Sequence, residues 1–231
     1  DGRLLVLLIG HGSFDGSDYK FNLVGPDATG AELKSWLDRF EKRQVVLVSS
    51  TPCSGVLTKT LSHNGRIVIT ATKSEFENND TVFAQFFVDA FKNKAADVDK
   101  NSEVSMLEAY LYAAQRVESW YKEQGRLATE HALLEDSGDA TGVARPSPAN
   151  GEGLLAAKFS LHAPSTALAT TGSASPELQA LGAEKQRLEG AIQDLKYKKA
   201  TVPEAEYNQQ METLLIQLAH TNQKMNAASK K

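Results

Sequence analysis

The stretches LLVLLIGHG (residues 4–12) and VVLVSSTPCSG (residues 45–55) are apolar runs that each end in a chemically reactive residue near a glycine. The first ends in His11 and Gly12, and the second ends in Cys53, the only cysteine of the chain. Short, continuously apolar runs are typical of strands that are buried on both faces of a sheet. We therefore predict two buried strands, with a histidine and a cysteine just beyond their carboxyl ends.

One amphipathic helix is predicted between these strands. Thr29 and Glu32 have the spacing of a capping box, and apolar residues follow at helical spacing: Leu33, Trp36, Leu37 and Phe40. A strand–helix–strand unit is parallel, so both strands end at the same edge of the sheet, roughly 5 Å apart. We therefore expect His11 and Cys53 to approach each other as a thiol nucleophile and its general base, at the edge where open α/β folds bind ligands.

The rest of the chain divides into three parts. Residues 1–143 are predicted to form one α/β domain, with a third strand at residues 67–70, a helix with an apolar face at residues 82–91 and a longer helix from Ser102 to Gly125. Residues 144–176 are rich in Ala, Ser, Thr, Pro and Gly, which is typical of a linker or loosely packed tail. Residues 177–228 show apolar residues at heptad spacing, which predicts an antiparallel helical hairpin.

These motifs, taken in order, resemble the caspase-like cysteine peptidases, a group that includes caspases, gingipains, separase and legumains. The resemblance rests on a strand that ends in His-Gly, a helix, and a next strand that ends in Cys-x-Gly. The segment HGSFDGSDYKFNLVGPDATGAEL (residues 11–33) and residues 102–142 resemble bacterial legumain-like proteins more specifically. The resemblance covers roughly residues 3–150. It implies a partial caspase-like parallel-sheet sandwich, without its N-terminal strands, before the helical hairpin.

The resemblance implies a cysteine endopeptidase that hydrolyses peptide bonds through an acyl-enzyme intermediate. His11 would be the general base, or the imidazolium partner of a thiolate, and Cys53 would be the nucleophile. The backbone N–H groups of Gly12 and Cys53 would form the oxyanion hole, where each such donor contributes about 3–4 kcal/mol to lowering the barrier. A cysteine beside a protonated histidine has a lowered pKa and hence more thiolate.

The loops at the same edge are the expected substrate-binding region. Small residues would line it: Ser13, Thr51, Thr70, Ala71 and Thr72. In the following loop, an acidic residue (Glu75, Glu77 or Asp80) could select a basic side chain, and Lys73 could select an acidic one. The competing interpretation of this loop is a solvated charged segment that selects nothing.

Two departures from the family pattern favour another interpretation. Pro52 stands before Cys53, where the family often has a small residue, and the His11 strand begins almost at residue 1. The chain therefore resembles a fragment or processing product, with part of the domain supplied by a separate N-terminal chain. The alternative function is a non-catalytic caspase-like scaffold that binds a helical partner through its hairpin.

Composition and missing motifs exclude several other classes. The net charge of −4 and the pI of about 5.8, without a basic patch, argue against a nucleic-acid partner. No apolar run has transmembrane length, and neither a phosphate-binding glycine loop nor a GxSxG nucleophile elbow occurs. The segment EDSGDATG (residues 135–142) does not match the twelve-residue calcium pattern, so we expect a surface turn, no metal and no cofactor. The resemblance alone suggests an extracytoplasmic location.

Overall fold

The structure is a computed structural model that describes residues 2–40, 42–161, 176–199 and 201–228. Contacts divide the chain into two compact units, residues 1–159 and residues 160–231. Each unit is described by itself below. The predicted strand–helix–strand arrangement lies in the first unit and the predicted helical hairpin in the second.

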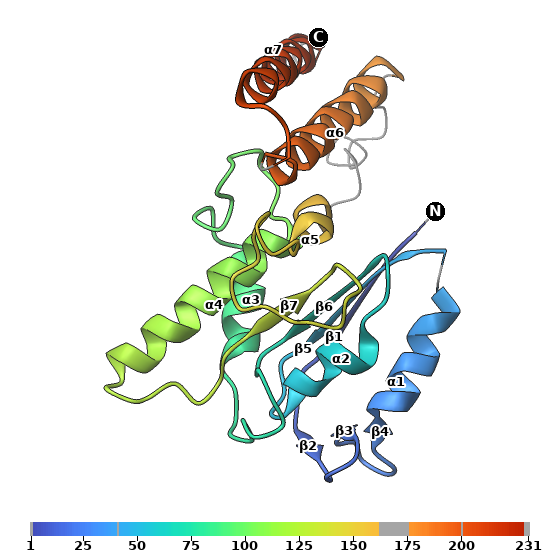
Figure 1. Ribbon diagram of the computed structural model, residues 1–231, viewed down its shortest axis with the longest axis vertical. Coiled ribbons are helices and arrows are strands. Elements are labelled where there is room, and N and C mark those ends of the chain that lie inside the picture. The colour runs from blue at the N-terminus through green and yellow to red at the C-terminus, as the bar shows by residue number, and fades with distance from the viewer. Residues whose placement is uncertain (1, 41, 162–175, 200, 229–231) are drawn as a thin grey trace. The chain divides into compact units, whose positions relative to one another are not determined.

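The first unit is built on a four-stranded sheet in the order β1-β5-β6-β7 (Figure 1). β1 (Arg3–Leu8), β5 (Gln44–Ser49) and β6 (Arg66–Thr70) are parallel, and β7 (Leu133–Glu135) runs antiparallel to β6. The three apolar runs thus form adjacent parallel strands, which confirms the predicted α/β class. β1 is an outer strand of this sheet, and its residues are half-buried from Leu4 to Leu8.

Helices cover both faces of this sheet (Figure 1). On one face lie α3 (Phe83–Ala90), α4 (Met106–Glu123) and α5 (Leu154–Lys158), packed on the side chains of Val46, Val48, Ile67 and Ile69. On the other face lie α1 (Gly30–Leu37) and α2 (Leu57–Leu61), packed on Val45, Leu47 and Val68. Successive residues of a strand point to opposite faces, so the continuous apolar runs supply both cores at once.

A small antiparallel sheet follows β1 directly and was not predicted from the sequence. It consists of β2 (Gly12–Phe14), β3 (Tyr19–Phe21) and β4 (Ala28–Thr29) in that order. β2 begins one residue after His11, and β4 ends at the residue that caps α1. This sheet therefore fixes the backbone on either side of the segment that carries the predicted histidine.

The predicted helix α1 is confirmed, but its buried face is narrower than expected. Thr29 and Glu32 form the predicted capping box. Leu33 and Leu37 are buried, whereas Trp36 and Phe40 are 45% and 38% exposed. Phe40 lies outside α1, which ends at Leu37, in a 3-10 turn (Asp38–Phe40) that replaces the expected last turn.

The start of α4 also differs from the prediction. The helix begins at Met106 rather than at Ser102, because Ser105 is its N-cap and forms a capping box with Glu108. Its end is as expected, since Glu123 is its last residue and Gly125 follows with a φ of +61°. Residues 102–105, predicted as the first turn of this helix, are consequently part of the loop that precedes it.

The second unit contains two long helices, α6 (Pro176–Tyr197) and α7 (Glu204–Ala228), which pack against each other. The predicted linker, residues 144–176, is described here only in part, since residues 162–175 lie outside the described residues. Its described beginning includes α5 and belongs to the first unit. Among the helices of the described segments, none has the length and apolar character needed to cross a membrane.

Candidate functional site

The segments after β1 and β5 meet where the sequence places a histidine and a cysteine. Leu8, the last residue of β1, pairs with Ser49, the last residue of β5. Beyond these ends, a Cβ at Gly12 would lie 2.6 Å from Thr51 Oγ1 and 2.7 Å from the carbonyl oxygen of Pro52. Such distances are too short for any side chain. Glycine at this position is therefore what allows the His11 segment to pack against the Cys53 segment.

The His11 imidazole lies on the surface beside a carboxylate. Its Nδ1 atom is 3.6 Å from Asp80 Oδ1, and the two side chains are 79% and 88% exposed. A contact between two side chains this exposed contributes little to stability. Within the described part of the chain, the imidazole forms no hydrogen bond with the Cys53 thiol.

Cys53 is buried, and its backbone has an uncommon conformation. The residue is 3% exposed and has a φ of +58°, in the left-handed region. Burial raises the pKa of the Cys53 thiol, the Glu75 carboxylate adds to this rise, and a hydrogen bond from the Phe14 backbone lowers the pKa in part. In this conformation the sulfur is therefore a thiol rather than a thiolate at neutral pH.

The Cys53 amide, one of the two predicted oxyanion-hole donors, already has an acceptor. Its N–H donates to the carbonyl oxygen of Glu77 over 2.8 Å. The Glu77 side chain, in turn, accepts hydrogen bonds from the backbone N–H groups of Lys73, over 2.9 Å, and His131, over 3.1 Å. It also contacts the His131 imidazole. These bonds hold the loop of residues 73–80 over the cysteine.

The residues expected to line a substrate pocket are mostly interior residues of the fold. Thr51, Thr70, Ala71 and Thr72 are fully buried, and only Ser13 is partly exposed. The hydroxyl groups of the threonines bond internally: Thr51 to Tyr19 Oη over 2.6 Å, Thr70 to the Thr72 carbonyl over 2.9 Å, and Thr72 to the Gly55 amide over 3.0 Å. In this structure these buried residues pack beneath the protein surface and stabilise the turn at Cys53, and they do not line an open pocket.

Tyr19 was not singled out from the sequence, although it belongs to the same region. Its side chain is fully buried, and its hydroxyl lies 3.4 Å from Ser49 Oγ and 2.6 Å from Thr51 Oγ1. A chain of hydroxyl groups thus links the small antiparallel sheet to the end of β5. No local pattern in the sequence marks this contact, because Tyr19 and Thr51 are far apart along the chain.

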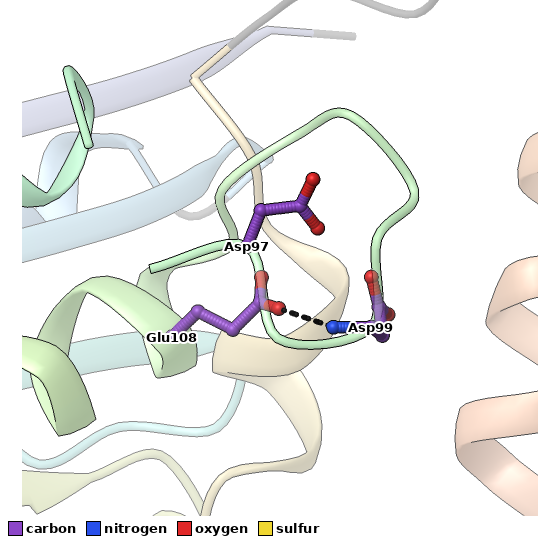
Figure 2. Close-up of side chains that lie close together, drawn as sticks. All are labelled: Asp97, Asp99 and Glu108. Atoms are coloured by element: carbon purple, nitrogen blue, oxygen red, sulfur yellow. Dashed lines mark hydrogen bonds between the residues drawn. The ribbon is translucent and has the colours of Figure 1, made fainter. Parts of the chain in front are cut away.

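Two groups of carboxylates come together in the first unit, away from Cys53 in the sequence. Asp97, Asp99 and Glu108 each place an oxygen within 4.8 Å of the others (Figure 2). Glu135, Asp139 and Glu152 do the same, with Glu135 and Glu152 buried. Both groups have the donor atoms that hard divalent cations prefer.

The second group carries less negative charge than its composition suggests. Burial raises the pKa of Glu135, and it raises that of Glu152 to about 7. The carboxyl of Glu152 is therefore partly protonated at neutral pH, which weakens the attraction for a cation. This second group is therefore the weaker candidate for a metal.

Sequence reasoning missed the first group, although the signal was present. Residues 97–108 read DVDKNSEVSMLE, with oxygen-bearing side chains at regular intervals, but this stretch was interpreted as the start of a helix at Ser102. The structure shows instead a loop that ends at the N-cap of α4.

The chain matches none of the protein-family models, none of the curated proteins and none of the solved structures with which it was compared. The arrangement of residues described above is therefore what any functional proposal must rest on.

Proposed function

We propose that this chain is a caspase-like cysteine endopeptidase, with Cys53 as nucleophile and His11 as general base. The observation that carries the proposal is the close packing of Gly12 on Thr51 and Pro52 at the ends of two adjacent parallel strands. Two residues that can catalyse acyl transfer together, His11 and Cys53, lie within two residues of this contact in the sequence. The left-handed backbone of Cys53 fits a nucleophile held in a tight turn.

The proposed reaction follows from these groups. The His11 imidazole accepts the thiol proton, and the thiolate attacks the carbonyl carbon of the scissile peptide bond. The N–H groups of Gly12 and Cys53 then donate to the oxyanion. The imidazolium gives its proton to the leaving amine, and water releases the acyl group from the sulfur with His11 again acting as base.

The described structure would be a closed form of such an enzyme. The Cys53 N–H already donates to the Glu77 carbonyl oxygen, so it is not available to an oxyanion, and burial keeps the Cys53 thiol protonated. Substrate binding must therefore displace the loop of residues 73–80. Loop displacement would also expose the sulfur, lower its pKa and free the loop side chains to contact the substrate.

The side chain of Glu77 is expected to control this opening. In a Glu77→Ala variant, the bonds to the Lys73 and His131 amides are lost, so the loop opens more often and Cys53 reacts faster with iodoacetamide. We expect the alkylation rate, followed by intact mass spectrometry, to rise at least about tenfold, which corresponds to the loss of roughly 1.4 kcal/mol of loop stability.

Glu118→Ala is the matched control, because Glu118 is an exposed carboxylate on α4. Its alkylation rate should equal that of the wild type. Equal rates in Glu77→Ala and wild type would show that the Glu77 side chain does not hold the loop closed.

A second function, that of a non-catalytic scaffold, is favoured by two observations. The only cysteine is buried with a raised pKa, and Leu215 and Ile216 on α7 are each 50% exposed, as apolar side chains that bind a helical partner would be. In either function, the outer strand β1 offers backbone groups with which a strand from a separate chain can pair.

The experiment that separates the two functions is labelling with substrate-like electrophiles. The protein, together with any N-terminal chain that purifies with it, is exposed to peptidyl acyloxymethyl ketones that differ at the P1 residue, and the adduct is located by mass spectrometry. An enzyme gives an adduct at Cys53 that depends on P1 and disappears in His11→Ala. No adduct, with iodoacetamide still reacting slowly at Cys53, overturns the peptidase proposal and favours the scaffold.

A further inference from the structure

Residues 97–108 have the ligand spacing of a calcium-binding loop. Counting Asp97 as position 1, oxygen-bearing side chains stand at positions 1, 3, 5, 7, 9 and 12: Asp97, Asp99, Asn101, Glu103, Ser105 and Glu108. An EF-hand loop uses these same positions, with the backbone carbonyl as ligand at position 7 and a glutamate at position 12. An apolar residue, Val104, stands at position 8.

The departure from the pattern is at position 6, where EF-hand loops have glycine and this chain has Ser102. The structure places Ser102 at a φ of +73°, the left-handed conformation for which glycine is otherwise selected. The sharp turn that the pattern requires is therefore present despite the substitution.

Backbone hydrogen bonds turn the side chains toward the centre of the loop. The N–H groups of Asn101 and Ser102 donate to the Asp97 carboxylate over 3.1 and 3.0 Å. The Asn101 N–H also lies 3.2 Å from Asp99 Oδ1, and the Glu103 N–H donates to Asn101 Oδ1 over 2.8 Å. The first half of the loop is thus wound around the oxygens at positions 1, 3 and 5.

Glu108 reaches this centre from the first turn of α4 (Figure 2). Its Oε1 atom accepts from the N–H groups of Val98, over 2.9 Å, and Asp99, over 3.3 Å. The oxygens of Asp97, Asp99 and Glu108 lie within 4.8 Å of one another. Since Ca²⁺–O distances are about 2.3–2.6 Å, two ligands on opposite sides of one ion are about 5 Å apart. The three carboxylates therefore lie close enough together to share a single Ca²⁺.

We propose that residues 97–108 bind one calcium ion through Asp97, Asp99, Asn101, the Glu103 carbonyl and Glu108, with Ser105 acting through water. Two independent observations support this: the twelve-residue spacing comes from the sequence, and the convergence of the carboxylates comes from the fold. The other acidic group, Glu135, Asp139 and Glu152, does not have this twelve-residue ligand spacing. Calcium is favoured over magnesium because a loop of mixed oxygen ligands suits the larger, less strictly octahedral ion.

The position of the loop gives the ion a structural role. The loop lies between α3 and α4, which cover one face of the sheet, and it ends at the N-terminus of α4. An ion that joins Asp97 and Asp99 to Glu108 therefore ties the connection between these helices to the first turn of α4. Unfolding releases the ion, so calcium stabilises the first unit by mass action.

The test uses the full chain, freed of metal with EDTA and titrated with CaCl₂ by calorimetry and thermal unfolding. We expect one site with a Kd between about 10⁻⁶ and 10⁻³ M. At a hundredfold excess over Kd, Tm should rise by about 5–10 °C. MgCl₂ at the same concentration should produce a clearly smaller shift.

Glu108→Gln and Asp139→Asn form the matched pair of variants. Glutamine can still close the capping box with Ser105, so Glu108→Gln should fold and yet bind Ca²⁺ more than about 100-fold less tightly. Asp139→Asn, in the other acidic group, should bind like the wild type. The proposal is overturned if about 10 mM Ca²⁺, above the weakest range of such loops, leaves wild-type Tm unchanged. Wild-type affinity in Glu108→Gln, loss of binding in Asp139→Asn, or an equal response to Mg²⁺ would also overturn it.

Discussion

A Cys53→Ala variant is expected to keep its fold and lose peptide hydrolysis, with turnover at least roughly 10⁴-fold below that of the wild type. The reason is that no other cysteine in the chain can form the acyl-enzyme. Alanine removes one sulfur atom and has the same backbone preferences, so it leaves the turn at φ +58° as it is. Turnover is measured with a fluorogenic peptide library, and folding by circular dichroism and Tm.

Two histidine variants complete this experiment. His11→Ala should reduce turnover by several orders of magnitude, whereas His63→Ala should not, because His63 lies in a turn where its Nδ1 contacts the Asn64 carbonyl. Turnover in Cys53→Ala within about tenfold of wild type, after a second purification step, would show that hydrolysis does not proceed through this thiol.

Gly55→Ala is expected to have the largest effect on stability. Gly55 lies where the turn after Cys53 crosses the loop of residues 73–80, and a Cβ there would overlap the backbone of Lys73 and Ser74, including the Lys73 carbonyl oxygen at 2.6 Å. The backbone at Gly55 cannot move away without loss of a hydrogen bond, because the Gly55 N–H donates to Thr72 Oγ1 over 3.0 Å. We expect a loss of about 3 kcal/mol or more, or a Tm lower by about 6–12 °C.

Gly2→Ala is the control for this substitution in the same unit. The atoms nearest to a Cβ at Gly2 belong to the Arg43 side chain, with Nη1 at 3.1 Å, and that side chain can move aside. Its effect on the free energy of unfolding should stay within about 0.5 kcal/mol. Similar Tm values for Gly55→Ala and Gly2→Ala would mean that the loop of residues 73–80 does not pack on Gly55 in solution.

Features that depend on neighbours in the sequence were predictable, and those that depend on distant contacts were not. The three parallel strands follow from short apolar runs, and the start of α1 follows from the Thr29–Glu32 pair. The Cys53 N–H is bound to the Glu77 carbonyl, and the Glu77 side chain is bound by the backbone N–H of His131, 54 positions further along the chain than Glu77. No local pattern carries that information.

The start of α4 shows a different kind of failure. Ser102 and Ser105 are both possible N-caps by residue type, and the choice between them depends on Glu108, which completes a capping box only with Ser105. The Ser105–Glu108 pair therefore places residues 102–105 in the preceding loop. With α4 starting at Met106, the twelve-residue spacing from Asp97 to Glu108 spans this loop and the first turn of the helix.

The pairing of β7 with β6 has a consequence for the order of folding events. β6 ends at Thr70 and β7 begins at Leu133, so roughly 60 residues, including α3 and α4, must be arranged before these strands meet. Closing a loop of this length is entropically unfavourable and slow unless its interior is already compact. During synthesis, β6 leaves the ribosome before β7 and is then an unpaired edge strand. The nascent chain can therefore associate wrongly through β6 until β7 has been synthesised and pairs with it.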